Sequence, residues 1–196
     1  MSLTKKPTAT KNLAERTQIC FQRFQIKSEY DRMRTLTFSY QWRWQMILFL
    51  DFDGVLHTDP CYDETQLFSC LPPLEAMLRD FPEVEIVISS TWRESRSLSE
   101  LKSFFSHDIG ARIIGVTPIW RDIPGIVEVI GYQRHAEIEA WIRNSEMPWQ
   151  QWIAIDDKSY LFKPFLPNLI KTNSSTGLDE IAIASLRQRL EAAIQK

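Results

Sequence analysis

Five short apolar runs, separated by segments of helical period, constrain the fold of this 196-residue chain more than any other feature. The runs are residues 46–50, 84–88, 112–116, 152–155 and 168–171. Because each run is apolar on both faces, it is typical of a central strand in a parallel sheet. Amphipathic helices are expected over residues 71–81, 97–105, 134–142 and 178–194. This alternation predicts an α/β fold: a doubly wound three-layer sandwich with a five-stranded, mostly parallel sheet and right-handed crossovers.

The charge of the chain divides it into two parts. Residues 1–45 contain nine Lys or Arg against three Asp or Glu, whereas residues 46–196 contain fourteen against twenty-two. We therefore expect a basic, poorly ordered N-terminal extension followed by one folded domain whose first strand begins at Met46. Two interpretations of the extension stay open. It is either a solvated tail, which would make Met46 a candidate translation start, or an arm that contacts nucleic acid.

Hydropathy and cysteine content predict where the protein resides. No apolar run approaches the roughly 18 residues that a membrane-spanning helix needs, and the N-terminus lacks the apolar segment of a secretory signal. Cys20, Cys61 and Cys70 have neither a CxxC nor a zinc-site spacing, so we expect free thiols in a reducing compartment. The expected location is the cytoplasm, with no membrane partner, and the sequence makes no prediction about oligomeric state.

Carboxylates and hydroxyls follow three of the predicted strands. The first strand is followed by Asp51 and Asp53, the second by several hydroxyl residues, and the fourth by Asp156 and Asp157. The carboxyl ends of parallel strands meet at one edge of a sheet, where open α/β sheets bind their ligands. Four carboxylates gathered there would repel one another unless a hard cation joined them, and Mg²⁺ binds carboxylate oxygens together with substrate phosphate. We therefore predict a magnesium site at this edge.

Three of these segments resemble the motifs of the haloacid-dehalogenase-like (HAD) superfamily. They are FLDFDGVL, the hydroxyls after VEIVIS, and IAIDD. The resemblance covers essentially all of residues 46–196 and implies that they form a HAD-like catalytic domain. More narrowly, ISSTWR, IIGVTP, the helix over residues 134–141 and the late TGLDE are similar to the HAD domain of Swiss-army-knife RNA-repair proteins and their stand-alone relatives.

The resemblance implies a role for each residue at the predicted edge. Asp51 would be the nucleophile that forms an aspartyl-phosphate, and Asp53 would be the general acid and then the general base. Ser90, or Ser89 one residue earlier, would hold a phosphoryl oxygen. The Mg²⁺ ligands would be Asp156, Asp157, Asp51 and the backbone carbonyl of Asp53.

The superfamily also uses a lysine or an arginine to balance the charge of the transferred group. Arg134 fits this role best, because it lies at the start of the helix that precedes the acidic strand. Lys158 and Arg93 remain alternatives, because the first follows the acidic pair and the second lies beside the hydroxyl motif. The expected substrate contacts are Ser89, Thr91, Gly54 and Lys158.

These features predict a Mg²⁺-dependent phosphohydrolase with an open active site. From Asp53 to Ser90 there is room for one helix and a short flap, and too little for a folded cap domain. Uncapped relatives commonly act on large substrates, so we expect a phosphorylated macromolecule, such as a nucleic acid with a terminal phosphate. Two alternatives stay open: a small-molecule phosphatase or nucleotidase that uses the same residues, and a non-catalytic binding module of an RNA-repair system.

The histidines and tryptophans are given no catalytic role. The three histidines lack metal spacing and are expected at the surface or in loops, with substrate contact as the alternative for His57. Most of the seven tryptophans are expected in the core. Trp92 and Trp120 lie near the predicted mouth of the site, where stacking on a nucleobase is the alternative.

Overall fold

The computed structural model describes residues 46–124, 131–145, 148 and 150–194, and the predicted basic extension, residues 1–45, lies outside them. Among the described residues, no helix has both the length and the apolar character needed to cross a membrane. Cys61 and Cys70 are free thiols, as expected, while Cys20 belongs to the segment that is not described.

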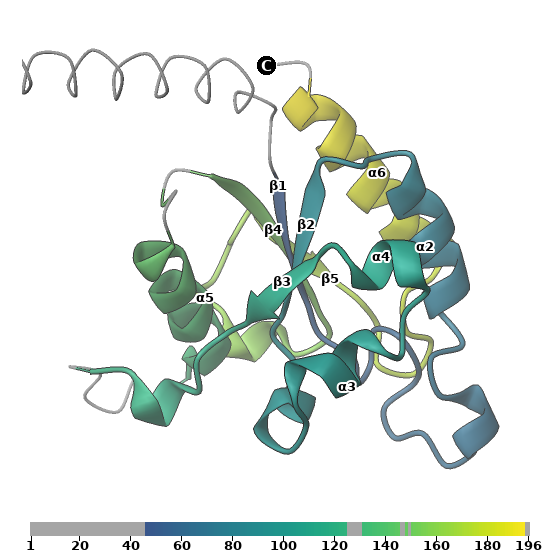
Figure 1. Ribbon diagram of the computed structural model, residues 1–196, viewed down its shortest axis with the longest axis horizontal. Helices are drawn as coiled ribbons and strands as arrows, with labels where there is room; N and C mark the ends of the chain where they lie inside the picture. Colours follow the sequence, from purple (N-terminus) through teal and green to yellow (C-terminus); the bar gives the residue numbers. More distant parts are fainter. Residues whose placement is uncertain (1–45, 125–130, 146–147, 149, 195–196) are drawn as a thin grey trace, which may run out of the picture. The chain divides into compact units, whose positions relative to one another are not determined.

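A five-stranded sheet forms the centre of the described part (Figure 1). Its strands are β1 (Met46–Leu50), β2 (Val84–Ile88), β3 (Ile113–Val116), β4 (Gln151–Asp156) and β5 (Leu169–Lys171). They lie in the order β3-β2-β1-β4-β5, and every neighbouring pair is parallel, where the sequence predicted a mostly parallel sheet. Leu50 of β1 lies beside Ile88 of β2 and Ile155 of β4. The residues that follow these three strands therefore emerge next to one another.

Helices cover both faces of the sheet, which confirms the predicted three-layer α/β arrangement (Figure 1). One face carries α2 (Leu71–Arg79), α3 (Leu98–Lys102), α4 (His107–Gly110) and α6 (Glu180–Ile194), and the other face carries α5 (Gln133–Asn144). Alternate side chains of β1 point to opposite faces. Leu48 and Leu50 enter the larger hydrophobic core, while Ile47 and Phe49 pack in the smaller core with Ile138 of α5.

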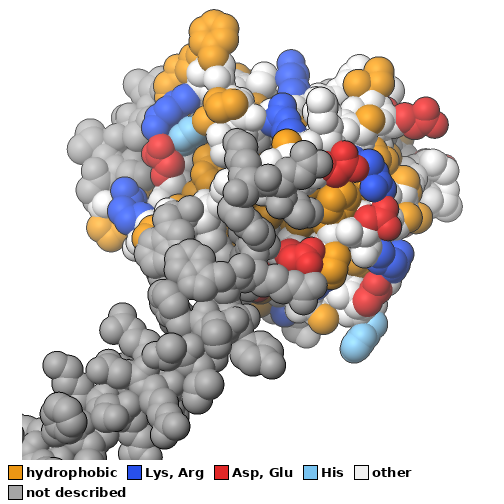
Figure 2. Space-filling model, turned by 90° about the horizontal axis from the view of Figure 1, so that it is seen from above, with side chains coloured by type: hydrophobic (Ala, Val, Ile, Leu, Met, Phe, Trp, Pro, Cys, Tyr) orange, Lys and Arg blue, Asp and Glu red, His pale blue; other side chains and the backbone are white. Residues whose placement is uncertain are grey.

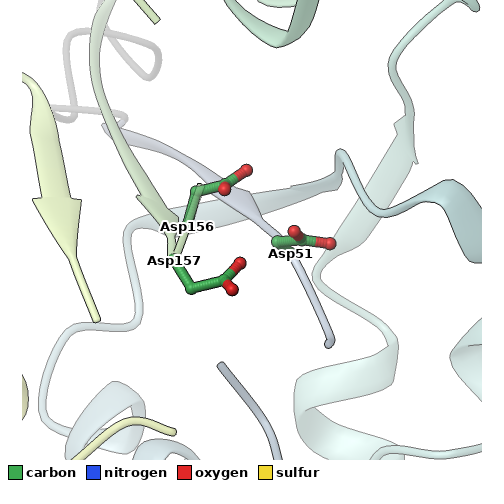
Figure 3. Close-up of side chains that lie close together, drawn as sticks. All are labelled: Asp51, Asp156 and Asp157. Atoms are coloured by element: carbon green, nitrogen blue, oxygen red, sulfur yellow. The ribbon is translucent and has the colours of Figure 1, made fainter. Parts of the chain in front are cut away.

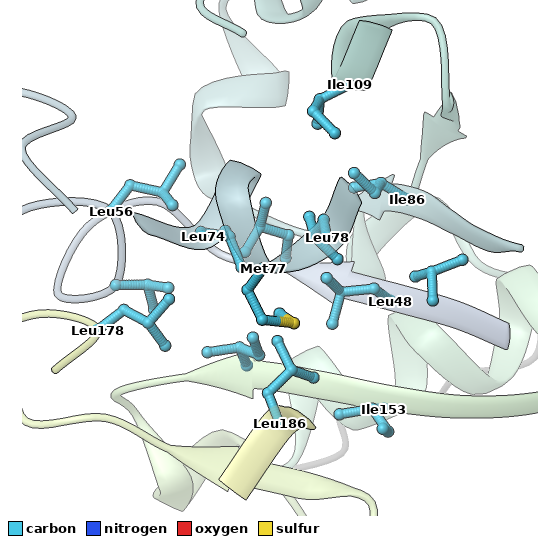
Figure 4. Close-up of a cluster of buried hydrophobic side chains, with 14 of the residues drawn as sticks. Leu48, Leu56, Leu74, Met77, Leu78, Ile86, Ile109, Ile153, Leu178 and Leu186 are labelled. Carbon is cyan, nitrogen blue, oxygen red and sulfur yellow. The ribbon is translucent and has the colours of Figure 1, made fainter. Parts of the chain in front are cut away.

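The larger core holds the first group of helices against the sheet (Figure 4). Its labelled members include Leu48, Ile86 and Ile153 from three neighbouring strands, which face Leu78 of α2 and Leu186 of α6. All five side chains are buried. Burying a side chain of this size contributes roughly 1.5–3 kcal/mol each, so this core fixes the strand ends that carry the polar residues.

Two helices differ in detail from the sequence prediction. The helix expected over residues 97–105 ends at Lys102, and a separate short helix, α4, begins at His107. In α6, Ile181 is 79% exposed although the apolar period placed it on the buried stripe. The buried stripe instead begins at Ala182 and continues every fourth residue through Leu186 and Leu190. Ile181 is one position, or about a quarter turn, outside that stripe.

The connections at the carboxyl edge of the sheet contain little regular structure in their described residues. Within the described residues they contain four single turns of 3₁₀ helix, η1 (Glu64–Gln66), η2 (Thr91–Glu94), η3 (Trp120–Asp122) and η4 (Ser159–Leu161), besides α3 and α4. The described part of residues 54–70, between β1 and α2, holds η1 and no other helix or strand. This agrees with the expected short flap.

Charges of both signs are interspersed over the described part of the face in Figure 2. Basic and acidic side chains alternate there without a large area of one sign. The described part of that face therefore offers no uniformly basic surface to a polyanion.

Candidate active site

Asp51 is the first residue after the central strand, and the sheet holds its backbone in place. Its N–H donates to the carbonyl of Ile155 on β4 at 3.2 Å. Its side chain is nearly inaccessible, with a residue exposure of 2%. The Oδ1 atom accepts the N–H of Phe52 at 2.8 Å, while Phe52 itself turns into the larger core. A buried carboxylate is thus held at the carboxyl end of β1, between the carboxyl ends of β2 and β4.

Asp156 and Asp157 bring two further carboxylates to Asp51. Asp156 is the last residue of β4, the strand directly beside β1. One oxygen from each of the three residues lies within 4.8 Å of the others, and Figure 3 shows the three side chains close together at the two strand ends. The sequence predicted this meeting, and the structure provides the pairing of β1 with β4 that causes it.

Two oxygens of this acidic group have no hydrogen bond that would compensate their burial. Within the described residues, Asp156 Oδ2 and Asp157 Oδ1 are buried and accept no hydrogen bond. Burial, followed by the charge of Asp51, raises the pKa of Asp156 to about 7, and burial likewise raises the pKa of Asp157. Ionised carboxylates in this setting call for a cation. The donors fit a hard divalent ion such as Mg²⁺, which prefers oxygen ligands.

Gly54 leaves the space that Asp157 occupies. It has φ +70°, a left-handed conformation that residues with a Cβ rarely adopt. A Cβ placed there would lie 2.5 Å from Cγ of Asp157. The carbonyl of Gly54 accepts the hydroxyl proton of Thr172, just after β5, at 2.7 Å. The substrate contact expected of Gly54 stays a prediction. Because Gly54 has no Cβ, the loop between β1 and α2, called the first loop below, can lie against Asp157 of the acidic group.

Arg134 extends from α5 into the acidic group. Its Nη2 lies 3.7 Å from Asp51 Oδ2, and its Nε lies 3.5 Å from Asp156 Oδ2. The residue is 4% exposed. Burial alone would lower its pKa, but the carboxylates of Asp51 and Asp156 outweigh burial and raise it. The Nη1 atom is buried and has no hydrogen-bond partner among the described residues. A positive charge with a free donor therefore lies beside the predicted nucleophile.

Arg93, an alternative for the same role, is occupied by structural contacts. Its guanidinium donates to the backbone carbonyls of four residues, Ser89, Ser90, Thr117 and Pro118. It also forms a buried ion pair with Glu137 of α5, with Nη2 and Oε2 2.7 Å apart. Glu137 Oε2 is 4.0 Å from Nε of Arg134. The buried carboxylate of Glu137 thus joins the loop after β2 to the arginine that enters the site.

Lys158, the other alternative, points to the first loop. Its Nζ lies 3.1 Å from Asp59 Oδ2, and both side chains are about one-third exposed. Its backbone N–H donates to Asp156 Oδ1 at 2.8 Å. Lys158 therefore holds Asp156 through its backbone, and its ammonium group makes an ion pair at the rim. Arg134 contacts the acidic group directly, whereas the Lys158 ammonium pairs with Asp59 and acts on Asp157 through its charge, which opposes the effect of burial on the pKa of that carboxyl.

Asp53 contacts a different set of side chains from Asp51. Its carboxylate is not part of the three-carboxylate group. Oδ1 lies 3.1 Å from Nε2 of His57, and the indole N–H of Trp92 donates to both Oδ1 and Oδ2 at 3.0 Å. The hydrogen bond with His57 is the main reason that the pKa of Asp53 is lowered; burial opposes this effect and Trp92 adds to it. The expected metal contact of Asp53, through its backbone carbonyl, stays a prediction.

The hydroxyl residues after β2 lie at the same edge. Ser89 donates its N–H to the carbonyl of Leu50 at 2.9 Å, which places it beside the start of the first loop. Ser90 is fully buried, and its Oγ caps η2 by accepting the N–H of Trp92 at 3.5 Å. Thr91 is exposed. Which hydroxyl contacts a phosphoryl group stays a prediction, and Ser90 remains our first choice.

Sequence reasoning missed three side chains of this site. His57 lies in the loop after β1, as expected, but it is 1% exposed and bonded to Asp53. Trp92 packs against the larger core, as expected for most tryptophans, but its indole N–H also contacts the same carboxylate. Glu137 was not singled out. The available signals were spacings: His57 lies four residues after Asp53, and Glu137 lies one helical turn after Arg134. The contact of Trp92 had no such signal.

Comparison with known proteins gives the family. The family model described as the HAD domain in Swiss Army Knife RNA repair proteins matches residues 47–183, a range that includes every site residue named above. Searches of curated proteins and of solved structures returned no match. The matched range covers more than half of the chain, and it agrees with a parallel sheet of order 3-2-1-4-5 that carries acids at its carboxyl edge. The chain therefore belongs to the family of HAD domains found in Swiss Army Knife RNA repair proteins.

Proposed function

We propose that this protein is a Mg²⁺-dependent phosphohydrolase that works through an aspartyl-phosphate on Asp51. HAD-superfamily domains are typically phosphohydrolases, and the family match supports this class of reaction. The observation that carries the proposal is the placement of Arg134. A buried guanidinium with a free Nη1 lies between two carboxylates of an acidic group. A bound cation together with Arg134 would let an anionic phosphoryl group approach carboxylates that would otherwise repel it.

The first half of the reaction would be phosphoryl transfer to the protein. An oxygen of Asp51 forms a bond to phosphorus while the bond from phosphorus to the leaving oxygen breaks. Asp53 acts in its protonated form, which its lowered pKa disfavours in the free protein and which the charge of an approaching phosphoryl group favours. It gives its proton to the leaving oxygen, and the substrate departs as an alcohol. Arg134 and the Ser90 hydroxyl hold the phosphoryl oxygens, with Ser89 as the alternative. Asp51, the Asp53 carbonyl, Asp156 and Asp157 would hold Mg²⁺, which when bound supplies positive charge against the charge of the transferred group.

The second half would be hydrolysis. Asp53, now a carboxylate, takes a proton from a water molecule whose oxygen attacks the phosphorus. The bond between Asp51 and phosphorus breaks, inorganic phosphate leaves, and Asp53 is again protonated. The sum is one phosphate monoester and one water converted into an alcohol and phosphate. Each protein group therefore returns to its initial state after one turnover.

We further propose a large phosphorylated substrate, such as the terminal phosphate of a nucleic acid. The described connection between β1 and α2, which holds a single 3₁₀ turn and no folded cap, and the RNA-repair context of the family support this choice. We also propose that residues 46–196 form the catalytic domain and that residues 1–45 are a basic extension of it; the match over residues 47–183 supports the first part. Gly54, Thr91 and Lys158 would line the approach to the phosphate. Free thiols at Cys61 and Cys70 support a cytoplasmic location.

A phosphate-release assay tests the proposal. We expect the protein with Mg²⁺ to release phosphate from 3′- or 5′-phosphorylated oligonucleotides, with a kcat/KM above that for mononucleotides, sugar phosphates and phosphopeptides. Asp51→Asn should reduce release to background, because an amide cannot act as the attacking anion. EDTA should also stop the reaction. Asp63→Asn is the matched control, since Asp63 is exposed and should be dispensable.

Each outcome separates the alternatives. Activity retained by Asp51→Asn would overturn the aspartyl-phosphate. Activity that survives EDTA would overturn the metal requirement. A tenfold preference for a mononucleotide or sugar phosphate would favour a small-molecule phosphatase, and release from no substrate would favour a binding module.

A further inference from the structure

Asp53 is held by two aromatic nitrogen donors that come from different parts of the chain. His57 follows Asp53 by four residues, while Trp92 lies in η2, beyond β2. Together they make three close contacts with one carboxylate, at 3.1 Å for His57 Nε2 and 3.0 Å twice for Trp92 Nε1. The Asp53 side chain is 29% exposed, so it is held in this way while remaining open to solvent on one side.

The two oxygens of Asp53 are not equivalent in these contacts. Oδ1 meets both His57 and Trp92, while Oδ2 meets Trp92 alone. An ionised carboxylate only accepts hydrogen bonds, so the His57 nitrogen that faces it, Nε2, carries the proton. Two donors on Oδ1 leave that oxygen little capacity to bind a proton of its own. Among the described residues, Oδ2 accepts one hydrogen bond where Oδ1 accepts two, so Oδ2 is better able to bind a proton.

From this geometry we propose that Trp92 is a positioning residue for Asp53, and that Oδ2 is the oxygen that carries the catalytic proton. The inference rests on the proposed phosphohydrolase function and adds a residue to it. In the first half of the reaction, the proton moves from Oδ2 to the leaving oxygen. In the second half, a proton from the attacking water moves to Oδ2. The indole N–H can only donate, so it takes no part in either transfer and keeps the carboxylate oriented through both.

The surroundings of Trp92 explain how one N–H can fix a carboxylate. The indole ring meets the rings of Phe52, Phe68 and Phe104 in edge contacts, with centroids 5.7, 5.4 and 5.7 Å away. The guanidinium carbon of Arg96 lies 4.2 Å from the centroid of the same ring. These contacts restrict rotation of the indole, so its N–H points at Asp53 without a further loss of side-chain entropy on binding. The indole is therefore a rigid support.

His57 supports the same carboxylate from the other side and is less suited to a test. It is buried, and its Nδ1 has no partner among the described residues. Replacing it would open a cavity beside Phe68, whose ring centroid is 5.4 Å away. Trp92→Phe removes the N–H while keeping an aromatic side chain, so it tests the hydrogen bond more directly. Phe104→Leu is the matched control, because it disturbs the same aromatic packing and keeps the indole N–H.

The test compares substrates whose leaving groups differ in their need for a proton. An alkyl phosphate needs protonation of its leaving oxygen, whereas a p-nitrophenyl leaving group departs readily without it. General acid catalysis is typically worth about 10²–10⁴-fold, and a misplaced acid should lose part of that. We expect Trp92→Phe to lower the rate constant for phosphorylation of the protein by an alkyl phosphate by about tenfold or more, measured in a single turnover. The loss with p-nitrophenyl phosphate should be severalfold smaller, and Phe104→Leu should affect both substrates equally.

A double variant separates positioning from a general structural role. If Trp92 acts through Asp53, adding Trp92→Phe to Asp53→Asn should cause no further loss in phosphorylation. An equal loss with both leaving groups, or a full further loss in the Asp53→Asn background, would overturn the proposal. Thermal melting of each variant shows whether it is folded under the assay conditions.

A spectroscopic measurement decides the same question without turnover. In a ¹H–¹⁵N spectrum, the indole resonance that disappears in Trp92→Phe identifies Trp92. We expect Asp53→Asn to move that resonance upfield, because a neutral amide accepts a weaker hydrogen bond than a carboxylate. An unmoved resonance would refute the hydrogen bond even if the protein proves to have no phosphatase activity. Absence of activity together with a moved resonance would instead refute the proposed function alone.

Discussion

At the scale of single residues, Gly54 has little freedom to change. An alanine at this position would be unfavourable for two separate reasons, the positive φ and the close approach of Asp157. The strained backbone conformation would cost about 1–3 kcal/mol. The added Cβ would also overlap the carboxylate carbon of Asp157, which would have to move. Gly54 therefore determines the placement of one member of the acidic group.

We expect Gly54→Ala to lower the stability of the protein by about 1–3 kcal/mol and to reduce Mg²⁺-dependent activity at least tenfold. The reason for the second effect is the displacement of the Asp157 carboxylate. Gly131→Ala is the control, since Gly131 has φ +105° but its Cβ would meet none of the described atoms within 4 Å. It should lose stability and keep activity. Denaturant unfolding and the phosphate-release assay measure the two effects, and equal activity losses in both variants would contradict the steric argument.

At the scale of elements, α5 delivers Arg134 to the site and Glu137 to its support. Glu137 is 4% exposed and lies beside the guanidinium groups of Arg93 and Arg134. Burial raises its pKa, while the two arginines oppose that shift. It also accepts the backbone N–H of Trp120 at 3.0 Å. The helix is thus tied by one carboxylate to the connections that follow both β2 and β3.

Two glutamates of α5 form a matched pair for a stability measurement. Glu137→Gln leaves the buried guanidinium of Arg93 without its counter-charge, which typically costs about 3–5 kcal/mol. Glu139→Gln removes a half-exposed carboxylate that pairs with His135 and Lys163, and it should cost under about 1 kcal/mol. Chemical denaturation of the two variants measures the difference. Similar losses would show that the ion pair of Arg93 and Glu137 contributes no more than a surface pair.

The elements also show how far the sequence could predict the structure. The five strands lie within one residue of the predicted ranges, because buried parallel strands are continuous apolar runs. The carboxyl ends of parallel strands meet at one edge of the sheet, so the convergence of Asp51, Asp156 and Asp157 was predictable as well. The contact between Trp92 and Asp53 was not, since it depends on how the loop after β2 folds back over 39 residues of sequence. Loop geometry leaves no periodic pattern.

At the scale of the whole molecule, the acidic group links stability to pH and to metal. The pKa of Asp156 is about 7 in the folded protein, against an ordinary value of 3.8. Between these values the folded state binds more protons than the unfolded state, so stability falls as pH rises. That loss is complete once the pH exceeds the folded pKa. A bound cation would reverse it, because it stabilises the ionised carboxylates.

We therefore expect the melting temperature in EDTA to be lower at pH 8 than at pH 5.5, by at least several degrees. Mg²⁺ should raise it at pH 8 and have little effect at pH 5.5. In Asp156→Asn both the difference between the two pH values and the response to Mg²⁺ should shrink markedly. Differential scanning calorimetry provides the measurement. A wild-type protein in EDTA that is more stable at pH 8 would contradict the raised pKa.

The position of β1 at the centre of the sheet has a consequence for motion. Strands flank it on both sides, so its amides are expected to exchange with solvent only when the whole domain opens. β3 and β5, each with one unpaired edge within the described sheet, can open locally at lower free energy. Asp51, the proposed nucleophile, directly follows this strand. In the proposed reaction, substrate entry and product release would therefore depend on fluctuations of the connecting loops, while the Asp51 carboxylate remains a fixed point around which they move.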